Sequence, residues 1–291
     1  MKRWLKPIFS WKALIAVLFF VFFIVPAIGA WWLETLRERA IRALEQKRAS
    51  RVIVLIHRQE SVNVLGIPVV RYINVEDSEA VLRAIRFTDP NTPLDMIVHT
   101  PGGLVLAASQ IARAVKRHPA KTTVFVPHYA MSGGTLIALA ASEIVMDVNA
   151  VLGPIDPQLG DFPAASILKV LEKKPMERIQ DITLVLADQS TKAIAQVTAL
   201  AQELLSGKMA SAKAEDVAQR MASGTWTHDF PITAEMAKDV IGLPVSTSVP
   251  EEVFRLIQLY PQARQTTSVY YLPGPRYKKE EPAGSPETQA P

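Results

Sequence analysis

The chain has 291 residues, of which 49% are hydrophobic and 21% charged, so it can bury one sizeable core with appendages. Its net charge of +4 is spread over helix-like segments without the aromatic pattern of RNA-binding proteins, and we predict no nucleic-acid partner. Cysteine is absent, which excludes disulfides, thiolate metal sites and a cysteine nucleophile.

The first feature along the chain is an uncharged run from Ala13 to Leu33, which follows a basic N-terminus at residues 1–12. A bilayer-spanning helix needs about 20 apolar residues, and this run is long enough. A pair of tryptophans near its end matches the aromatic belt of a membrane interface. We predict a transmembrane anchor, while a cleaved secretory signal ending near Ala27 or Ala30 is the alternative.

Basic residues flank the run on both sides, so the positive-inside rule leaves open which side of the membrane the rest of the chain occupies. We predict a single-pass membrane protein, with the bacterial inner membrane as its expected location. Residues 34–51 are charged with a narrow apolar stripe, which predicts a juxtamembrane helix. A solvated connector is favoured here over a helix that lies on lipid or pairs with a copy of itself.

The globular domain is predicted at residues 52–272, followed by a disordered Pro-rich and charged tail at residues 273–291. Strand-like and helix-like runs alternate in its first half, which predicts an α/β fold with a largely parallel sheet flanked by helices. The predicted strands are Val52–His57, Met96–Thr100, Thr122–Val126 and Ile144–Asp147. The predicted helices are Asn74–Arg86, Leu104–Lys116, the TLIALAAS segment after Ser132, Ala164–Lys174, Asp181–Leu205, Ala214–Met221 and Thr233–Val240.

Two glycine-rich turns stand at the carboxyl ends of predicted strands, where ligands gather in parallel sheets. Gly102 and Gly103 follow the second strand, and Ser132 and Gly133 follow the third at the start of a helix. Acyl transfer needs an exposed nucleophile beside free backbone N–H groups, and the first turn of a helix supplies such groups. We therefore predict Ser132 as the nucleophile and Gly102, Gly103 and Gly133 as the oxyanion hole. The alternative is two ordinary turns with Ser132 as a helix N-cap.

The order of these motifs resembles a known family. HTPGG, YAMSGGT and AASEIVMDVNAVLGPIDPQ, followed by THDFPIT and the pair Gly242-Leu243, are similar to the serine dehydrogenase proteinase family of the ClpP/crotonase fold, a relative of bacterial signal peptide peptidase A. The resemblance covers roughly Val52 to Ser246. It implies serine peptidase activity, a peptide or protein substrate, and a closed homo-oligomer such as a trimer or hexamer. We expect no cofactor and no metal.

The resemblance also implies a Ser–Lys dyad, because signal peptide peptidases of this superfamily pair the serine with a neutral lysine. We predict Lys192 as the base, on a long helix that should pack beside the site, with Lys173 and Lys174 as alternatives. Asp188 lies one turn before Lys192, where it could orient the amine. The same spacing is also that of an ordinary surface ion pair, which would raise the lysine pKa and oppose its use as a base.

His228 in the THDFPIT segment is the rival base, because a His–Asp pair commonly activates serine and Asp229 is its neighbour. In ClpP the catalytic histidine falls where Ile155-Asp156-Pro157 stands here, so a ClpP triad is not carried over. Asp156 is predicted to bind substrate, with capping of its proline turn as the alternative. His99 and Tyr129 are predicted to line the substrate cleft, with packing at the end of its strand as the simpler alternative for His99.

The favoured function is therefore a membrane-anchored serine endopeptidase. Two other functions stay open for the same fold. A crotonase-like acyl-CoA enzyme would use the glycine turns as an oxyanion hole, and an inactive membrane scaffold would bind peptides without a base.

Overall fold

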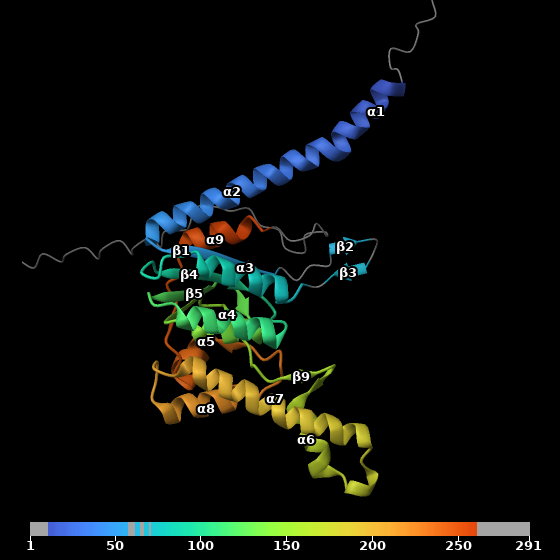
Figure 1. The fold of residues 1–291 in the computed structure, drawn as a ribbon, viewed down its shortest axis with the longest axis vertical. Coiled ribbons are helices and arrows are strands. Elements are labelled where there is room, and N and C mark those ends of the chain that lie inside the picture. The colour runs from blue at the N-terminus through green and yellow to red at the C-terminus, as the bar shows by residue number, and fades with distance from the viewer. Residues whose placement is uncertain (1–10, 58–61, 65–66, 70, 261–291) are drawn as a thin grey trace, which may run out of the picture.

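The computed structural model describes residues 11–57, 62–64, 67–69 and 71–260, so the predicted tail at residues 273–291 lies outside the described chain. A continuous helical rod comes first: α1 (Trp11–Phe19), the π-helical segment η1 (Phe20–Ile24) and α2 (Val25–Arg48) (Figure 1). Pro26 stands in the first turn of α2. Because proline lacks an N–H and its ring crowds the preceding turn, the irregular segment η1 lies where the helix is expected to be disturbed. From Leu14 onward the rod is long and apolar enough to cross a membrane, and its apolar window is fully exposed.

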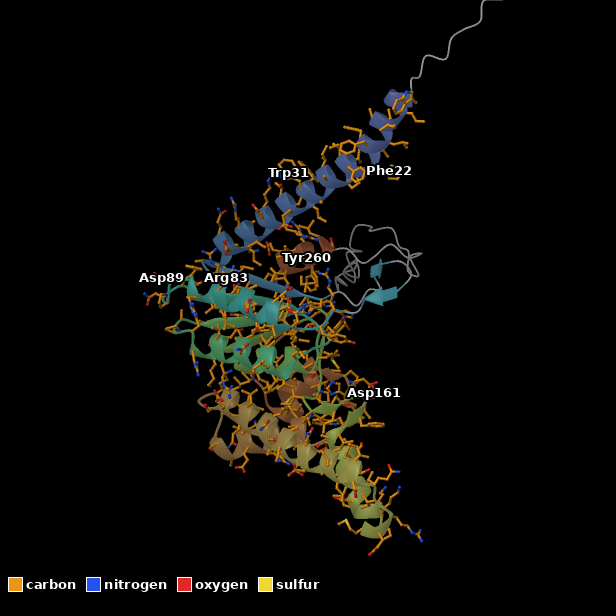
Figure 2. The ribbon with its side chains drawn as sticks, turned by 45° about the vertical axis from the view of Figure 1, so that its right-hand side comes forward. Phe22, Trp31, Arg83, Asp89, Asp161 and Tyr260 are labelled. Atoms are coloured by element: carbon orange, nitrogen blue, oxygen red, sulfur yellow. The ribbon has the colours of Figure 1, made fainter. Side chains whose placement is uncertain are left out.

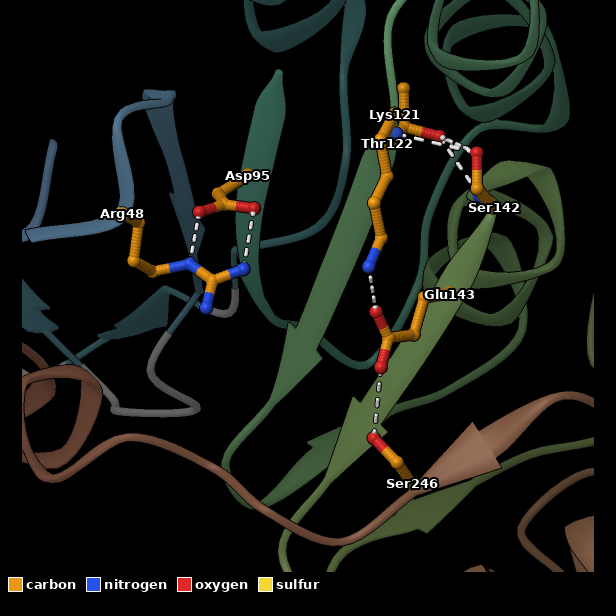
Figure 3. Close-up of polar contacts among 7 residues, drawn as sticks. All are labelled: Arg48, Asp95, Lys121, Thr122, Ser142, Glu143 and Ser246. Carbon is orange, nitrogen blue, oxygen red and sulfur yellow. Dashed lines mark hydrogen bonds and ion pairs between the residues drawn. The ribbon is translucent and has the colours of Figure 1, made fainter.

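The second half of α2 packs on the sheet, which corrects the expectation of a solvated connector. Leu44 is fully buried between the sheet and α9 (Glu251–Gln258), a helix that we did not predict. At the end of α2, the Arg48 guanidinium donates to both carboxylate oxygens of the buried Asp95 (Figure 3). Ala49 then adopts a left-handed conformation, and this turn leads directly into the first strand.

Five parallel strands form the central sheet, in the spatial order β1 (Arg51–Ile56), β4 (Leu94–His99), β5 (Thr122–Val126), β7 (Glu143–Met146) and β12 (Val245–Ser246). Three helices pack on one face: α3 (Val75–Arg86), α4 (Val105–Arg117) and α5 (Gly133–Ala140). The other face is covered by α2 and α9 (Figure 1). Every residue of β4 and β5 is buried, which explains why apolar residues follow one another without alternation at Met96–Val98 and Val124–Val126. The predicted fold class, a parallel sheet between helices preceded by one apolar helix, is confirmed.

The two edges of this sheet differ in chemistry. Polar contacts link neighbouring strands at the amino edge, the edge formed by the amino ends of the strands. Lys121 pairs with Glu143 at 2.6 Å, and Glu143 accepts a hydrogen bond from Ser246 at 3.3 Å (Figure 3). The carboxyl edge carries the turns that contain Gly102, Gly103 and Ser132. Ligands bind at the carboxyl ends of strands in such sheets, so the carboxyl edge is where a site is expected.

Three more helices lie between β7 and β12 in the chain: α6 (Ala164–Lys173), α7 (Asp181–Leu205) and α8 (Ser211–Ala222). The short 3-10 turn η2 (Met176–Arg178) lies between α6 and α7. The second half of α7 and all of α8 pack outside α5 and extend the core. α6 and the first half of α7 project away from the rest of the molecule (Figure 1).

Several strands are too short to have been predicted from the sequence. A second sheet has the order β11 (Ile232–Thr233), β8 (Val151–Leu152) and β6 (Tyr129–Ala130), and two hairpins pair β2 (Val62–Val64) with β3 (Ile67–Val69) and β9 (Gln158–Leu159) with β10 (Phe162–Pro163). The predicted helix Thr233–Val240 is wrong at its start, because Thr233 ends β11. The helical segment there, η3 (Met236–Ile241), is of the π type.

Candidate active site

Ser132 occupies a strained turn between β6 and α5. Its backbone has φ 47° and ψ −113°, and Ala49 is the only other non-glycine residue with positive φ in the described chain. Such a conformation costs on the order of 1–3 kcal/mol and persists only where the surroundings impose it. The hydroxyl makes no capping hydrogen bond to α5, so the reading of Ser132 as an ordinary N-cap has no support from its contacts.

The Pro-Gly-Gly turn lies directly against Ser132. A Cβ built on Gly102 would come within 2.8 Å of Ser132 Cβ and 3.1 Å of the Gly133 nitrogen, so only glycine fits here. Gly102 (φ 108°) and Gly103 (φ 155°) both have positive φ, which glycine tolerates. The two glycine turns are therefore in contact, as the sequence predicted from their positions at strand ends.

The backbone N–H groups of this contact are not equivalent. The Gly102 N–H donates to Thr100 Oγ1 at 3.2 Å and is occupied. Among the described residues, no hydrogen bond uses the N–H of Gly103 or of Gly133. A Cβ on Gly133 would lie 3.5 Å from the Gly103 nitrogen, so the two free donors are neighbours. This arrangement can receive an oxyanion through Gly103 and Gly133, while Gly102 shapes the turn.

A hydrogen-bonded His–Asp pair, of which the aspartate is buried, lies at the same end of the molecule as Ser132. His228 Nδ1 lies 2.8 Å from Asp156 Oδ1, and the Asp156 side chain is only 2% exposed. The other Asp156 oxygen accepts a hydrogen bond from Gln158 at 2.7 Å. The His228 side chain is about one-third exposed. The sequence had paired His228 with its neighbour Asp229, and the partner in the structure is instead Asp156.

The second sheet brings this pair and Ser132 to one edge. β6 and β8 are parallel, so Ser132, just after β6, and Asp156, just after β8, leave the sheet at the same end. β11 is antiparallel to β8, so His228, which precedes β11, also lies at that end. The loops touch, because a Cβ on Gly153 would lie 3.3 Å from Met131 Cα. A nucleophile candidate and a His–Asp pair therefore share one edge.

The three lysines predicted as candidate bases are exposed on a helix or at a helix end. Lys192 Nζ lies 2.5 Å from Asp188, and the Lys192 side chain is 66% exposed, as in a surface ion pair. Lys173 and Lys174 are exposed at the end of α6. Neither these three lysines nor His228 has a described contact with Ser132, so each remains a predicted base.

The sequence analysis missed one lysine with an unusual environment. Burial lowers the pKa of Lys208 to about 7, and the charge of Lys116 acts in the same direction. Its amine donates to the carbonyl of Leu139 in the last turn of α5. α5 has 8 residues, about 12 Å, so this amine and Ser132 are at opposite ends of the helix. A low lysine pKa cannot be seen in a sequence, because burial causes it.

Aromatic rings surround the end of β4. His99 is buried, and its ring centroid lies 4.2 Å from that of Tyr129 and 5.6 Å from that of His128. His57, a residue that we did not predict, is also buried here, with Nδ1 2.9 Å from Thr100 Oγ1. Burial lowers the pKa of His57 despite the Asp77 carboxylate 3.3 Å away.

A cavity of about 650 Å³ opens beside the His57 ring. It is lined by His57, Tyr72, Gly103 and Leu104, among others. A peptide side chain could enter it next to the free N–H of Gly103. The assignment of His99 and Tyr129 to the substrate cleft stays a prediction.

Fold and site geometry together point to a ClpP-like serine proteinase. The chain belongs to the family described as ClpP-like SDH-type serine proteinase, whose model matches residues 3–285. The predicted family membership is therefore confirmed, and the family is one of serine peptidases.

Two similar proteins from Methanocaldococcus jannaschii are themselves uncharacterised. One is 54% identical over 89% of this chain and 91% of its own length, and the other is 52% identical over 90% and 89%.

Solved structures with a similar fold include two mutants of the membrane-bound stomatin-specific protease 1510-N. One is 20% identical, with a TM-score of 0.43 over 64% of this chain and 79% of that chain. The other, in complex with a substrate peptide, is 21% identical, with a TM-score of 0.44 over 71% and 80%. ClpP1 from Listeria monocytogenes is 15% identical, with a TM-score of 0.44 over 71% and 97%.

Proposed function

We propose that this chain is a membrane-anchored serine endopeptidase in which Ser132 is the nucleophile and His228 its base. The observation that supports this most is the hydrogen bond between His228 and the buried Asp156, at the edge of the sheet where the strained Ser132 turn lies. A carboxylate on Nδ1 fixes the imidazole tautomer so that Nε2 can accept the serine proton.

The reaction follows from these positions. His228 Nε2 takes the hydroxyl proton as Ser132 Oγ attacks the peptide carbonyl carbon. The negative charge that develops on the carbonyl oxygen is received by the N–H groups of Gly103 and Gly133. His228, whose positive charge Asp156 stabilises, then protonates the leaving amine. Water attacks the acyl-enzyme through the same base and releases Ser132.

The Ser132–Lys192 dyad remains the competing arrangement. A lysine base must reach the serine hydroxyl, whereas the Lys192 amine is exposed on α7 and pairs with Asp188 on the same helix. The inactive-scaffold alternative rested on the missing ClpP histidine, and the pair of His228 with Asp156 weakens that reason. We therefore prefer the histidine base and an active peptidase.

The proposal extends to the setting of the enzyme. The apolar rod from Leu14 onward supports a single-pass anchor. The substrate is a peptide or protein, and no cofactor is required by the mechanism above. Exposed apolar side chains on η2 and the first half of α7 support a closed homo-oligomer such as a trimer or hexamer.

The test uses the detergent-solubilised full chain, a fluorophosphonate probe and fluorescein-labelled casein. Ser132→Ala should abolish probe labelling and hydrolysis. His228→Gln should reduce turnover nearly as far, and Asp156→Asn by about 10⁴-fold, because the residues of a triad act as one unit. Lys192→Met is the matched control and should keep normal turnover, since its ion pair is exposed. Normal activity in His228→Gln together with loss in Lys192→Met would replace this proposal with the Ser–Lys dyad.

A further inference from the structure

The membrane rod is attached to the catalytic domain at two points along α2. Near its middle, Arg37 Nε donates to the Leu259 carbonyl at 2.9 Å, and the Arg37 guanidinium lies 4.3 Å from the Tyr260 ring centroid. At its end, Arg48 binds the buried Asp95. About 16 Å of helix separates the two attachments, so α2 cannot pivot freely on the sheet.

The first attachment lies close to the predicted end of the membrane span. The uncharged run ends at Leu33, and Arg37 follows about one helical turn later. α2 is unbroken through this region, with no loop between span and domain. The domain is therefore held at a fixed distance and in a fixed direction from the anchor.

The direction in which the anchor leaves the domain follows from the turn at Ala49. α2 runs back over the sheet from its junction with β1, so the start of α2 lies toward the carboxyl end of β1 (Figure 1). The six residues of β1 span about the same length as the part of α2 between Arg37 and Arg48. The carboxyl edge of the sheet is thus roughly level with Arg37, next to the membrane end of α2.

The opposite edge points away from the membrane. Figure 2 shows Asp89, in the loop that leads into β4 at the amino edge, on the far side of the domain from Phe22 in the rod. Trp31 lies on the rod between Phe22 and the domain (Figure 2). The edge that carries Ser132 therefore faces the bilayer, and the ion-paired amino edge faces away from it.

We propose that α2 is a rigid spacer that holds the catalytic edge toward the membrane surface, so that a polypeptide anchored in the same membrane is cut close to the point where it leaves the bilayer. The scissile bond would lie within about 20 Å of the bilayer, or roughly the first six extended residues that emerge from it. The inference rests on the proposed peptidase function. It adds a limit on which bond of the substrate is cut. This limit is set by the distance of the bond from the bilayer and not by the amino-acid sequence of the substrate.

The experiment places the full chain in phosphatidylcholine–phosphatidylglycerol liposomes. The substrate is an unstructured casein segment coupled through an N-terminal cysteine to a maleimide lipid, and mass spectrometry identifies the bonds that are cut. The wild type should cut the tethered segment near its lipid end. An insertion of seven helix-forming residues between Leu33 and Glu34 lengthens the spacer by about 10 Å, so the cleaved bonds should shift outward by about three residues.

Two controls separate this inference from the peptidase proposal. The same seven residues inserted ahead of the apolar run leave α2 unchanged and should leave the cleavage positions unchanged. Soluble casein should be hydrolysed equally by all three proteins. Hydrolysis of soluble casein combined with even cutting along the tethered segment, or with no shift after the insertion in α2, would overturn the spacer. Failure to cut either substrate would overturn the peptidase proposal itself.

Discussion

At the scale of single residues, the geometry of Ser132 depends on the absence of a side chain opposite it. Its backbone is strained, and Ser132 Cβ occupies the space that a Cβ on Gly102 would need. Thr135 holds the other side, because its hydroxyl donates to the Ala130 carbonyl at 2.7 Å and accepts from the Gly153 N–H at 3.0 Å. The Ser132 turn is thus held by close packing against Gly102 and by hydrogen bonds of the Thr135 side chain to Ala130 in β6 and to Gly153 just after β8.

This packing predicts the effect of Gly102→Ala. The new methyl group would meet Ser132 Cβ at 2.8 Å, so the serine turn must shift, and fluorophosphonate labelling should fall at least 100-fold, as expected for about 1 Å of displacement. Gly160→Ala is the matched control, because Gly160 also has positive φ (64°) but nothing lies within 4 Å of its Cβ position. It should cost about 1 kcal/mol of stability and keep full labelling. Equal labelling of the two variants would contradict the contact argument.

The sequence predicted Ser132 and the glycines because each stands in a short local motif. It did not predict the partner of His228, because Asp156 is 72 residues away and reaches it only through β8 and β11. Each of these strands has two residues, too few to show any periodic pattern. The neighbour Asp229 was the natural choice from sequence, and tertiary pairing selected the distant carboxylate.

At the scale of elements, α5 begins just after Ser132, the proposed nucleophile, and ends beside Lys208, a lysine with a lowered pKa. Its first turn follows Ser132, where the helix dipole favours negative charge. Its last turn receives the Lys208 amine at the Leu139 carbonyl, where the dipole favours a cation. Burial nevertheless lowers the pKa of Lys208 from 10.5 to about 7, so desolvation outweighs the helix end.

The lowered pKa predicts how stability changes with pH. Below about pH 7 Lys208 is charged in both states and the folded chain bears the full cost of its burial. Between about 7 and 10.5 only the unfolded chain holds the proton, so the free energy of unfolding rises with pH. Lys208→Met should remove that part of the rise, measured as the melting temperature of the full chain in detergent at a series of pH values. Lys192→Met, at an exposed ion pair, should keep the wild-type slope. Identical slopes in wild type and Lys208→Met would refute the assignment.

Long elements were predicted well and short ones were not. The strand Thr122–Val126 and the helix Asp181–Leu205 have the predicted bounds, because buried apolar runs and helical periodicity are strong signals. α2 was recognised as a helix, but its burial was missed. Its core contact depends on Leu44 and on Arg48 reaching Asp95, and neither a single leucine nor a distant ion pair forms a pattern in the sequence.

At the scale of the whole molecule, the sheet is a central layer between two different helical surfaces. α2 and α9 connect one face to the membrane rod, and the other face carries α3, α4 and α5 with α7 and α8 beyond them (Figure 1). The site lies at the carboxyl edge between these layers, and α6 with the first half of α7 projects beyond the core. That projection exposes Met176, Ile182 and Val185 at 62%, 58% and 53% of their surfaces.

This projection is where the proposed homo-oligomer can be tested. Apolar side chains on an extended arm are stabilised when a second copy of the chain covers them. In a closed ring the arm of every copy would be covered in this way. We expect the detergent-solubilised wild type to sediment as an oligomer and Ile182→Asp/Val185→Asp to sediment as a folded monomer, because two carboxylates would have to be desolvated at the interface. Val240→Asp is the control, since Val240 is equally exposed at 58% but lies in η3, outside the arm. A monomeric wild type, or an arm variant that still assembles like Val240→Asp, would show that these side chains do not form the interface.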